Sequence, residues 1–400
     1  MKKKMLITCT VVLVTAAVIL GFVLKNQVRE NPDKNTVNVA IGQWDTTQNE
    51  SQNYWNPDNH AVAKGMGGYY FIQTADGISK IAFFDETTQE AVAVCAKPEC
   101  THSDNTCNAY LCDMKQTGSA LYLTDTIYCY NGYLYLIQCE GGMGKLVRIH
   151  TDGSARETIA DLFANTGVSS ISLVFHENDV YAYDDTGHAG QEEEAEEVIK
   201  KISLTDGTEQ TVFSYTGTGA SIDRGRSFGD KLYFVIREYT KNKETKAVSS
   251  DYKGLFEYDF ATGDTRKVID ADVCDYHADT ENQMLFYFVQ GTGLYAYDMT
   301  QGSNTLIYPA EDELIQCKMS YDGKNLYLFN NGAGRATETK TRIQRYCYVL
   351  DTKGNQIAKI LCNGIVYFGD TDYLFEENGD NLEYMKKENL SDKSEWIQVN

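Results

Sequence analysis

A short aromatic phrase returns seven times along this chain of 400 residues. In each copy a tyrosine or another aromatic residue lies in an alternating apolar run, usually just after a Gly, Asn or Asp turn. The copies are residues 68–71, 134–136, 180–183, 232–234, 285–288, 326–328 and 373–375. Successive copies are about 40 to 65 residues apart, the range in which repeats indicate propellers or solenoids.

Each phrase belongs to a unit of four strand-like runs. In one unit the phrase 180–183 follows the run 171–175, and the runs 198–202 and 208–213 come after it, separated by a Thr-Asp-Gly turn. Glycine in such turns supplies the positive φ that tight hairpins require. Four strands in about 50 residues is the size of one propeller blade.

The sequence therefore predicts an all-β fold, a seven-bladed β-propeller with four-stranded antiparallel blades. Blade boundaries are expected near residues 60, 113, 167, 219, 271, 314 and 363. Residues 394–399 should form the outer strand of the last blade, and 90–94 its counterpart in the first. If each blade is complete in its own sequence, the ring closes without strand exchange. A pair of β-sandwiches, whose strands are also regularly spaced, is the alternative.

The N-terminus predicts a membrane anchor over residues 1–25. Three lysines precede an uncharged apolar run, residues 5–24, which is long enough to span a bilayer as one helix. The lysines place the N-terminus in the cytoplasm and the rest of the chain outside. We expect one uncleaved transmembrane helix, because a cleaved signal peptide has a shorter apolar region and a small-residue exit site. The expected location is the cell membrane, single-pass, with an extracellular C-terminal domain.

The remaining chain divides into two parts. Residues 26–60 are polar and offer too little apolar surface to fold alone, so they predict a stalk, and 61–400 form the propeller. Beyond residue 30 the chain has 31 basic and 56 acidic residues, a net charge of −25. Such a domain repels nucleic acid and anionic lipid. We therefore expect membrane contact only through the N-terminal helix.

One segment, residues 95–112, is dense in metal-ligating side chains: Cys95, Cys100, His102, Cys107 and Cys112. Disulfides among its four cysteines are favoured, because the segment is expected outside the cell and has no core of its own. A structural zinc ion held by the first three cysteines and the histidine is the second interpretation. Free thiols are the third. We expect a compact knob on one rim, at the junction of blades one and two.

Catalytic motifs are scarce. The chain has no P-loop and no His-Glu-x-x-His. Gly225–Gly229 matches Gly-x-Ser-x-Gly, but a polar loop precedes it and a strand-like run follows, whereas a nucleophile elbow joins a strand to a helix. We predict a turn without catalytic meaning there, and we assign no catalytic and no cofactor-binding residue. The sequence thus favours a protein that is not an enzyme.

Residues 131–135 (Asn-Gly-Tyr-Leu-Tyr), followed by 145–154 (Lys-Leu-Val-Arg-Ile-His-Thr-Asp-Gly-Ser), resemble a blade of TolB-like propellers. They also resemble uncharacterised Gram-positive surface propellers. The resemblance covers about residues 60–400; it supports the fold and implies no catalytic residue. It leaves open a membrane-anchored extracellular scaffold that binds a protein, peptide or glycan ligand. The alternative is an extracellular hydrolase or lyase acting on cell-wall or other glycans at the channel mouth. Carboxylates, His and Arg converging at one end of the channel would favour the enzyme.

Overall fold

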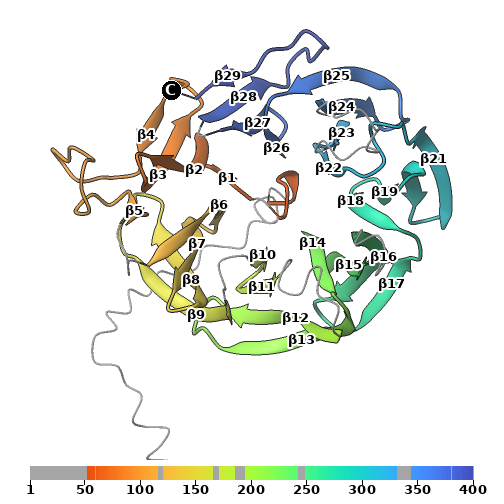
Figure 1. Ribbon diagram of the computed structural model, residues 1–400, viewed down its shortest axis with the longest axis horizontal. Coiled ribbons are helices and arrows are strands. Elements are labelled where there is room, and N and C mark those ends of the chain that lie inside the picture. Colours follow the sequence, from red (N-terminus) through yellow and green to blue (C-terminus); the bar gives the residue numbers. More distant parts are fainter. Residues whose placement is uncertain are drawn as a thin grey trace, which may run out of the picture. The chain divides into compact units, whose positions relative to one another are not determined.

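A computed structural model describes residues 52–58, 60–115, 120–164, 171–184, 194–241, 248–330, 344–379 and 381–399. These residues form a ring of seven antiparallel sheets (Figure 1). The predicted seven-bladed propeller is therefore confirmed. The predicted anchor, residues 1–25, and most of the predicted stalk lie outside the described residues. Among the residues that are described, no helix is long and apolar enough to cross a membrane.

The sheets consist of strands that are consecutive in the sequence. Blade 1 contains β1 (Val62–Gly65), β2 (Gly68–Ala75), β3 (Ile78–Asp85), β4 (Ala91–Ala93) and β5 (Tyr110–Asp113), and blade 2 contains β6 (Leu121–Tyr130), β7 (Tyr133–Glu140), β8 (Met143–His150) and β9 (Glu157–Ala164). Blade 3 contains β10 (Ile171–His176), β11 (Asp179–Asp184), β12 (Glu194–Ser203) and β13 (Glu209–Thr218), and blade 4 contains β14 (Ser221–Phe228), β15 (Lys231–Lys241), β16 (Val248–Asp259) and β17 (Thr265–Ile269). Blade 5 contains β18 (Val273–Asp279), β19 (Met284–Val289), β20 (Gly293–Asp298) and β21 (Ser303–Pro309), and blade 6 contains β22 (Lys318–Tyr321), β23 (Asn325–Phe329), β24 (Arg345–Asp351) and β25 (Gln356–Cys362). Blade 7 contains β26 (Ile365–Phe368), β27 (Tyr373–Asn378), β28 (Asn381–Lys386) and β29 (Ile397–Gln398).

The ring closes by side-chain packing between blades 7 and 1. No strand of blade 1 joins the sheet of blade 7, and β29 is the outermost strand of blade 7, as expected. Tyr69 of β2 packs on Phe375 of β27, with ring centroids 4.8 Å apart. The Tyr69 hydroxyl also donates to the carboxylate of Asp370, at 2.8 Å from Oδ2. An aromatic ring with a polar tip therefore seals the junction, which is why tyrosine recurs in the repeat.

The segment that precedes β1 lies inside the ring and is called the plug here: Gln52–Asp58 and His60. It begins with a short 3₁₀ helix, η1 (Gln52–Tyr54), drawn in red toward the middle of the ring in Figure 1. Its polar groups bond to the innermost strands of several blades. Gln52 Nε2 donates to Phe175 O at 2.8 Å, Ser320 Oγ donates to Tyr54 O at 3.0 Å, and Asn56 N donates to Tyr367 O at 3.1 Å.

The plug corrects the predicted stalk, residues 26–60. Gln52–Asp58 and His60 belong to the propeller, because their polar side chains pair with strand backbone that would otherwise face the channel. The low apolar content of this segment predicted disorder, but most of its binding to the ring is polar. Trp55 is the exception, and it is buried against the aromatic residues of blades 1 and 7.

We predict that Trp55→Ala lowers the free energy of unfolding by about 3–5 kcal/mol, the usual cost of emptying a buried aromatic site. Trp55 is 1% exposed and lies edge-on to Tyr69, with ring centroids 6.0 Å apart. Urea denaturation followed by circular dichroism measures the loss. Trp396→Ala is the matched control, because Trp396 is only half-buried at the edge of blade 7. Equal losses in the two variants would contradict the role of the plug.

We also predict that the plug makes stability sensitive to acid. Burial lowers the pKa of His60 from 6.5 to about 4, although its contacts with carbonyl oxygens act the other way. The folded protein keeps this ring neutral, while the unfolded chain protonates it below 6.5. Stability should therefore fall as the pH drops from about 6.5 to about 4. Thermal melts across this range should show wild type losing its advantage over His60→Gln; parallel curves would refute the prediction.

Candidate metal centre on blade 1

The fourth strand of blade 1 is split into two pieces by the Cys/His insertion. β4 pairs with one half of β3, opposite Ala82–Phe84, and β5 pairs with the other half, opposite Ile78–Lys80. Between them Ile81 holds both ends of the insertion: Val94 N donates to Ile81 O at 3.0 Å, and Ile81 N donates to Ala109 O at 2.9 Å. Residues 95–108, called the knob here, therefore leave the strand and return to it at one point. Figure 1 shows this loop projecting outward from the ring.

The position of the knob corrects one detail of the sequence prediction. It interrupts the outer strand of blade 1 and does not follow the complete blade. It does lie beside blade 2, because the guanidinium of Arg156 donates to the carbonyl of Asn108. The expectation of a rim position next to blade 2 is thus met, although the insertion point is different.

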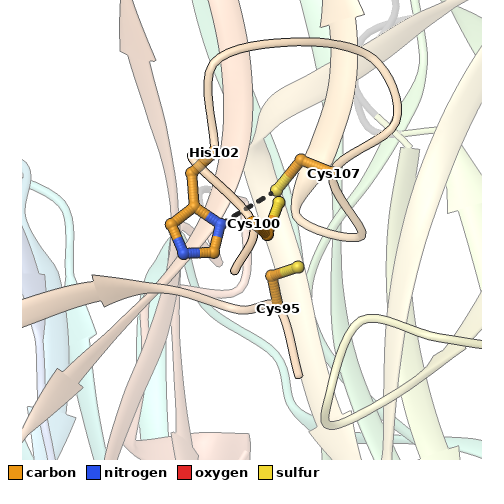
Figure 2. A group of neighbouring side chains, drawn as sticks. All are labelled: Cys95, Cys100, His102 and Cys107. Carbon is orange, nitrogen blue, oxygen red and sulfur yellow. Dashed lines mark hydrogen bonds between the residues drawn. The ribbon is translucent and has the colours of Figure 1, made fainter. Parts of the chain in front are cut away.

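The knob brings Cys95, Cys100, His102 and Cys107 together. One ligand atom from each lies within 4.8 Å of all the others. Figure 2 shows the three sulfur atoms grouped with the imidazole, and the dashed line joins His102 Nδ1 to Cys107 Sγ at 3.3 Å. Cys107 is buried, and the other three side chains are partly exposed. The described cysteines all carry free thiols.

Cys112 lies apart from this group. It is in β5, paired with Ser79 of β3, and it is buried in the apolar core that blades 1 and 2 share. It is not in the group that the other three cysteines form with His102, and the zinc interpretation of the sequence also left it out. Any pairing that includes Cys112 would require β5 to move away from β3.

Local turns give the knob its shape. Asp104 Oδ1 accepts hydrogen bonds from Thr106 N at 2.9 Å and from Thr106 Oγ at 2.6 Å. Cys107 N donates to Asp104 O at 3.2 Å, and Cys100 N donates to Lys97 O at 3.4 Å. These two turns place Cys100 and Cys107 on the side of the loop that faces Cys95. An Asx turn of this kind is a local sequence property.

Positive charge surrounds the cluster. Lys80 Nζ donates to the carbonyl of His102, and Lys97 Nζ donates to the carbonyl of Thr106. With Arg156, three basic side chains therefore bind the backbone of one short loop in a chain of net charge −21. Such an arrangement compensates thiolates, and it suits a site whose ligands carry negative charge.

The pKa of Cys95 is lowered, which also favours a thiolate in this cluster. Burial, the largest influence, raises this pKa, but hydrogen bonds from the backbone of Lys97 and Asn108 and from the thiols of Cys100 and Cys107 outweigh it. Together they lower the pKa of Cys95 to about 6 from 9.0. Burial raises the pKa of Cys107. The cluster can therefore hold at least one thiolate near neutral pH.

The donor set fits zinc. Three thiolates and one imidazole form a closed tetrahedral site of the structural type, and soft sulfur ligands do not suit Mg²⁺ or Ca²⁺. Zinc ligands lie about 4 Å or less from one another, because metal–ligand bonds are about 2.0–2.3 Å long. The separations of up to 4.8 Å would have to contract by less than about 1 Å. The residues present therefore match a zinc ion without a change of fold.

A lysine is paired with two of the three members of a second, acidic group. Carboxylate oxygens of Glu86, Asp370 and Asp372 lie within 4.8 Å of one another. The ammonium of Lys64 contacts Glu86 and lies 3.2 Å from Asp370 Oδ2. A side chain of the protein thus occupies the place that a cation would take.

The propeller channel holds the charged residues that would have favoured an enzyme. Arg226 Nη1 donates to Asp275 Oδ1 at 2.6 Å, and Arg226 Nη2 donates to Met319 O at 2.9 Å. Arg224 forms an ion pair with Asp58 of the plug. Arg226 and Asp275 are 1% and 0% exposed in their side chains. The group is therefore an internal network beneath the plug, with no surface open to a substrate.

The sequence interpretation missed this network, although one member, Arg226, lies in the string Gly225–Gly229. That string is not the predicted turn: it continues β14, which has a bulge in its pairing with β15. The expected lack of an elbow holds, because a strand follows. A Cβ on Gly225 would lie 2.6 Å from the ring of Tyr183, so glycine is required there by close packing. Two arginines in one inner strand were the signal that pointed to a buried ionic network.

Comparisons with known proteins identify no family for this chain. No family model matches the chain, and no curated protein matches it. Similar solved structures include an oligogalacturonate lyase in complex with manganese, at 11% identity and TM-score 0.45, covering 66% of this chain and 70% of the lyase. They also include an uncharacterized protein of Listeria monocytogenes EGD-e, at 12% identity and TM-score 0.42, covering 71% and 84%, and the WD40 domain of Toxoplasma gondii coronin, at 9% identity and TM-score 0.41, covering 67% and 67%. The strand pairing defines a seven-bladed β-propeller with a Cys/His knob on its first blade. No family model supports the resemblance to TolB-like propellers.

Proposed function

We propose that this protein is a binding module in which a zinc-held knob presents a recognition surface on the rim of a rigid propeller. The observation that carries the proposal is the convergence of Cys95, Cys100, His102 and Cys107 to within 4.8 Å. We further propose that the module is displayed outside the cell on its N-terminal anchor. Its partner would be a protein, a peptide or a glycan.

The geometry of the knob supports a role in recognition. The loop leaves and re-enters the outer strand opposite Ile81 of β3. The blade would therefore be complete without it. A loop of this kind has little apolar surface of its own, so cross-links or a metal would add to the hydrogen bonds that order it. Binding residues in proteins lie mainly on loops that a rigid scaffold positions. The knob is such a loop on the rigid blade, and the proposed zinc ion would hold it in place.

The alternative, a glycan hydrolase or lyase at the channel mouth, lacks a supporting observation. The charged residues of the channel are buried, and Arg226 and Asp275 bond to each other. Asp223 is also buried beside Arg237, and burial raises its pKa to about 6. Buried ionic networks perturb pKa values without any catalytic role.

We expect about one zinc ion per chain in the purified full-length protein, because a closed Cys₃His site binds this metal. Elemental analysis of the detergent-extracted protein measures it. Cys95→Ser and His102→Ala should lose most of the zinc, since each removes a ligand. Cys112→Ala is the matched control and should keep it, because Cys112 lies in β5 away from the cluster.

The same samples separate the three interpretations of the cysteines. Disulfides would appear as blocked thiols in the denatured, metal-free protein, and a bridge to Cys112 would disappear in Cys112→Ala. Free thiols would give neither zinc nor blocked groups. A protein without zinc would overturn the metal centre. With zinc present, chelation should expose Glu99 to the glutamate-specific protease Glu-C and leave the circular dichroism of the propeller unchanged.

The anchor generates a separate prediction. Alkaline carbonate should leave the protein in the membrane fraction, because an uncleaved helix of residues 5–24 stays in the bilayer. Protease added to intact cells should digest the propeller domain and leave the N-terminus protected. Mass spectrometry that finds a mature N-terminus beyond residue 17 would refute an uncleaved anchor.

A further inference from the structure

A cavity of about 640 Å³ lies where blades 6, 7 and 1 meet. Its walls are the β22–β23 turn, the β26–β27 turn, the residues at the end of β28 and Glu86 after β3. Its volume is typical of small-molecule sites, which measure about 300–1,000 Å³. The cavity shares no residue with the knob, so its occupant can be considered independently of zinc.

A buried lysine forms part of the cavity wall. The side chain of Lys387 is 3% exposed. Its ammonium donates to Gly369 O at 3.2 Å and to Asp322 Oδ2 at 3.3 Å, and it lies 4.0 Å from the centre of the Tyr327 ring. An ammonium has three donors, and the two bonds to oxygen atoms are long.

Asp322 neutralises this lysine only in part. Its Oδ2 accepts a shorter bond from the Tyr327 hydroxyl, at 2.7 Å. Its Oδ1 accepts the backbone N–H groups of Lys324 at 3.0 Å and Asn325 at 2.8 Å, which fix the β22–β23 turn. The carboxylate is therefore shared among four donors, and Lys387 keeps positive potential toward the cavity.

Other charges on the walls have no ion-pair partner among the described residues. Lys324 and Lys386 are the positive ones, and Asp372 and Glu388 are the negative ones. The remaining wall acid, Glu86, is bonded to Lys64. A purely anionic ligand would meet the free carboxylates, and a purely cationic ligand would meet the free ammonium groups. Like charges brought together oppose binding, so each of these ligands is disfavoured.

We propose that this cavity binds a small zwitterion of the peptide class, with its carboxylate at Lys324, Lys386 and Lys387 and its ammonium at Asp372 and Glu388. A ligand that carries both charges meets the unpaired Lys324, Lys386, Asp372 and Glu388 together, and its carboxylate also lies near Lys387, which Asp322 neutralises only in part. The cavity volume exceeds that of a single amino acid and accommodates a short peptide.

Titration calorimetry of the full-length protein in detergent tests the proposal with trialanine as the probe. N-acetyl-trialanine and trialanine amide are matched probes, each lacking one terminal charge. Trialanine should bind, and each blocked peptide should bind at least about tenfold more weakly, a loss of about 1.4 kcal/mol. If trialanine at about 10 mM gives no heat of binding, its dissociation constant is above that concentration, and the proposal is overturned.

Two exposed positions test the two ends of the site without disturbing the core. Lys386→Gln should weaken the binding of trialanine and leave that of trialanine amide unchanged, because trialanine has a C-terminal carboxylate and the amide has none. Asp372→Asn should weaken trialanine and leave N-acetyl-trialanine unchanged. Lys359→Gln is the control, since Lys359 lies in the outer strand of blade 6, 2.8 Å from Glu313. Equal binding of all three peptides, or equal effects on charged and blocked peptides, would refute the assignment.

Discussion

The contact between blades 7 and 1 is the interaction on which the ring depends. No strand is exchanged there, so the circle is closed by side-chain packing and by the backbone bond from Asn56 of the plug to Tyr367. Tyr69 fills the junction with its ring and donates its hydroxyl to Asp370, while Lys64 bonds to the same carboxylate. Burial, and then the nearby Asp370 charge, raise the pKa of Tyr69, so the hydroxyl remains a donor. A hydrogen bond to a charged group contributes about 1.5–3 kcal/mol, and this one is supported by aromatic packing.

The plug adds a second connection, across the channel. It bonds to inner strands of blades that are far apart in the ring, whereas each blade junction joins only neighbours. Its Asp58 also enters the network of Arg224, Arg226 and Asp275. Breaking a buried ion pair by removing one partner is costly, so the plug and the inner strands depend on each other. This arrangement leaves the channel as part of the core.

The two candidate sites of this protein do not use the buried ionic network of the channel. The knob projects from the outer strand of blade 1, and the cavity opens among the turns of blades 6 and 7. The base of the knob is fixed by the hydrogen bonds of Ile81 to Val94 and Ala109. The cavity is formed by residues of blades 6, 7 and 1. The knob splits only the outer strand of blade 1 and leaves the other blades four-stranded, so a regular fold can carry two unrelated sites.

The sequence by itself determined the repeat. Predicted blade boundaries near 60, 113, 167, 219, 271, 314 and 363 compare with first strands that begin at Val62, Leu121, Ile171, Ser221, Val273, Lys318 and Ile365. Strand alternation and turn glycines are local properties, so they can be read from neighbouring residues. The cysteine cluster was visible for the same reason, since its members are close in sequence.

Only the tertiary structure decided which of those cysteines meet and where the polar segments go. Cys112 lies in β5, apart from the group, and β5 pairs with residues of β3 that are 30 to 35 positions away in the sequence. The plug bonds its Asn53 to Ser227, 174 residues away, and Tyr69 bonds to Asp370, 301 residues away. Such contacts leave no periodic signal, because a polar side chain that binds distant backbone looks the same in sequence as one that binds water.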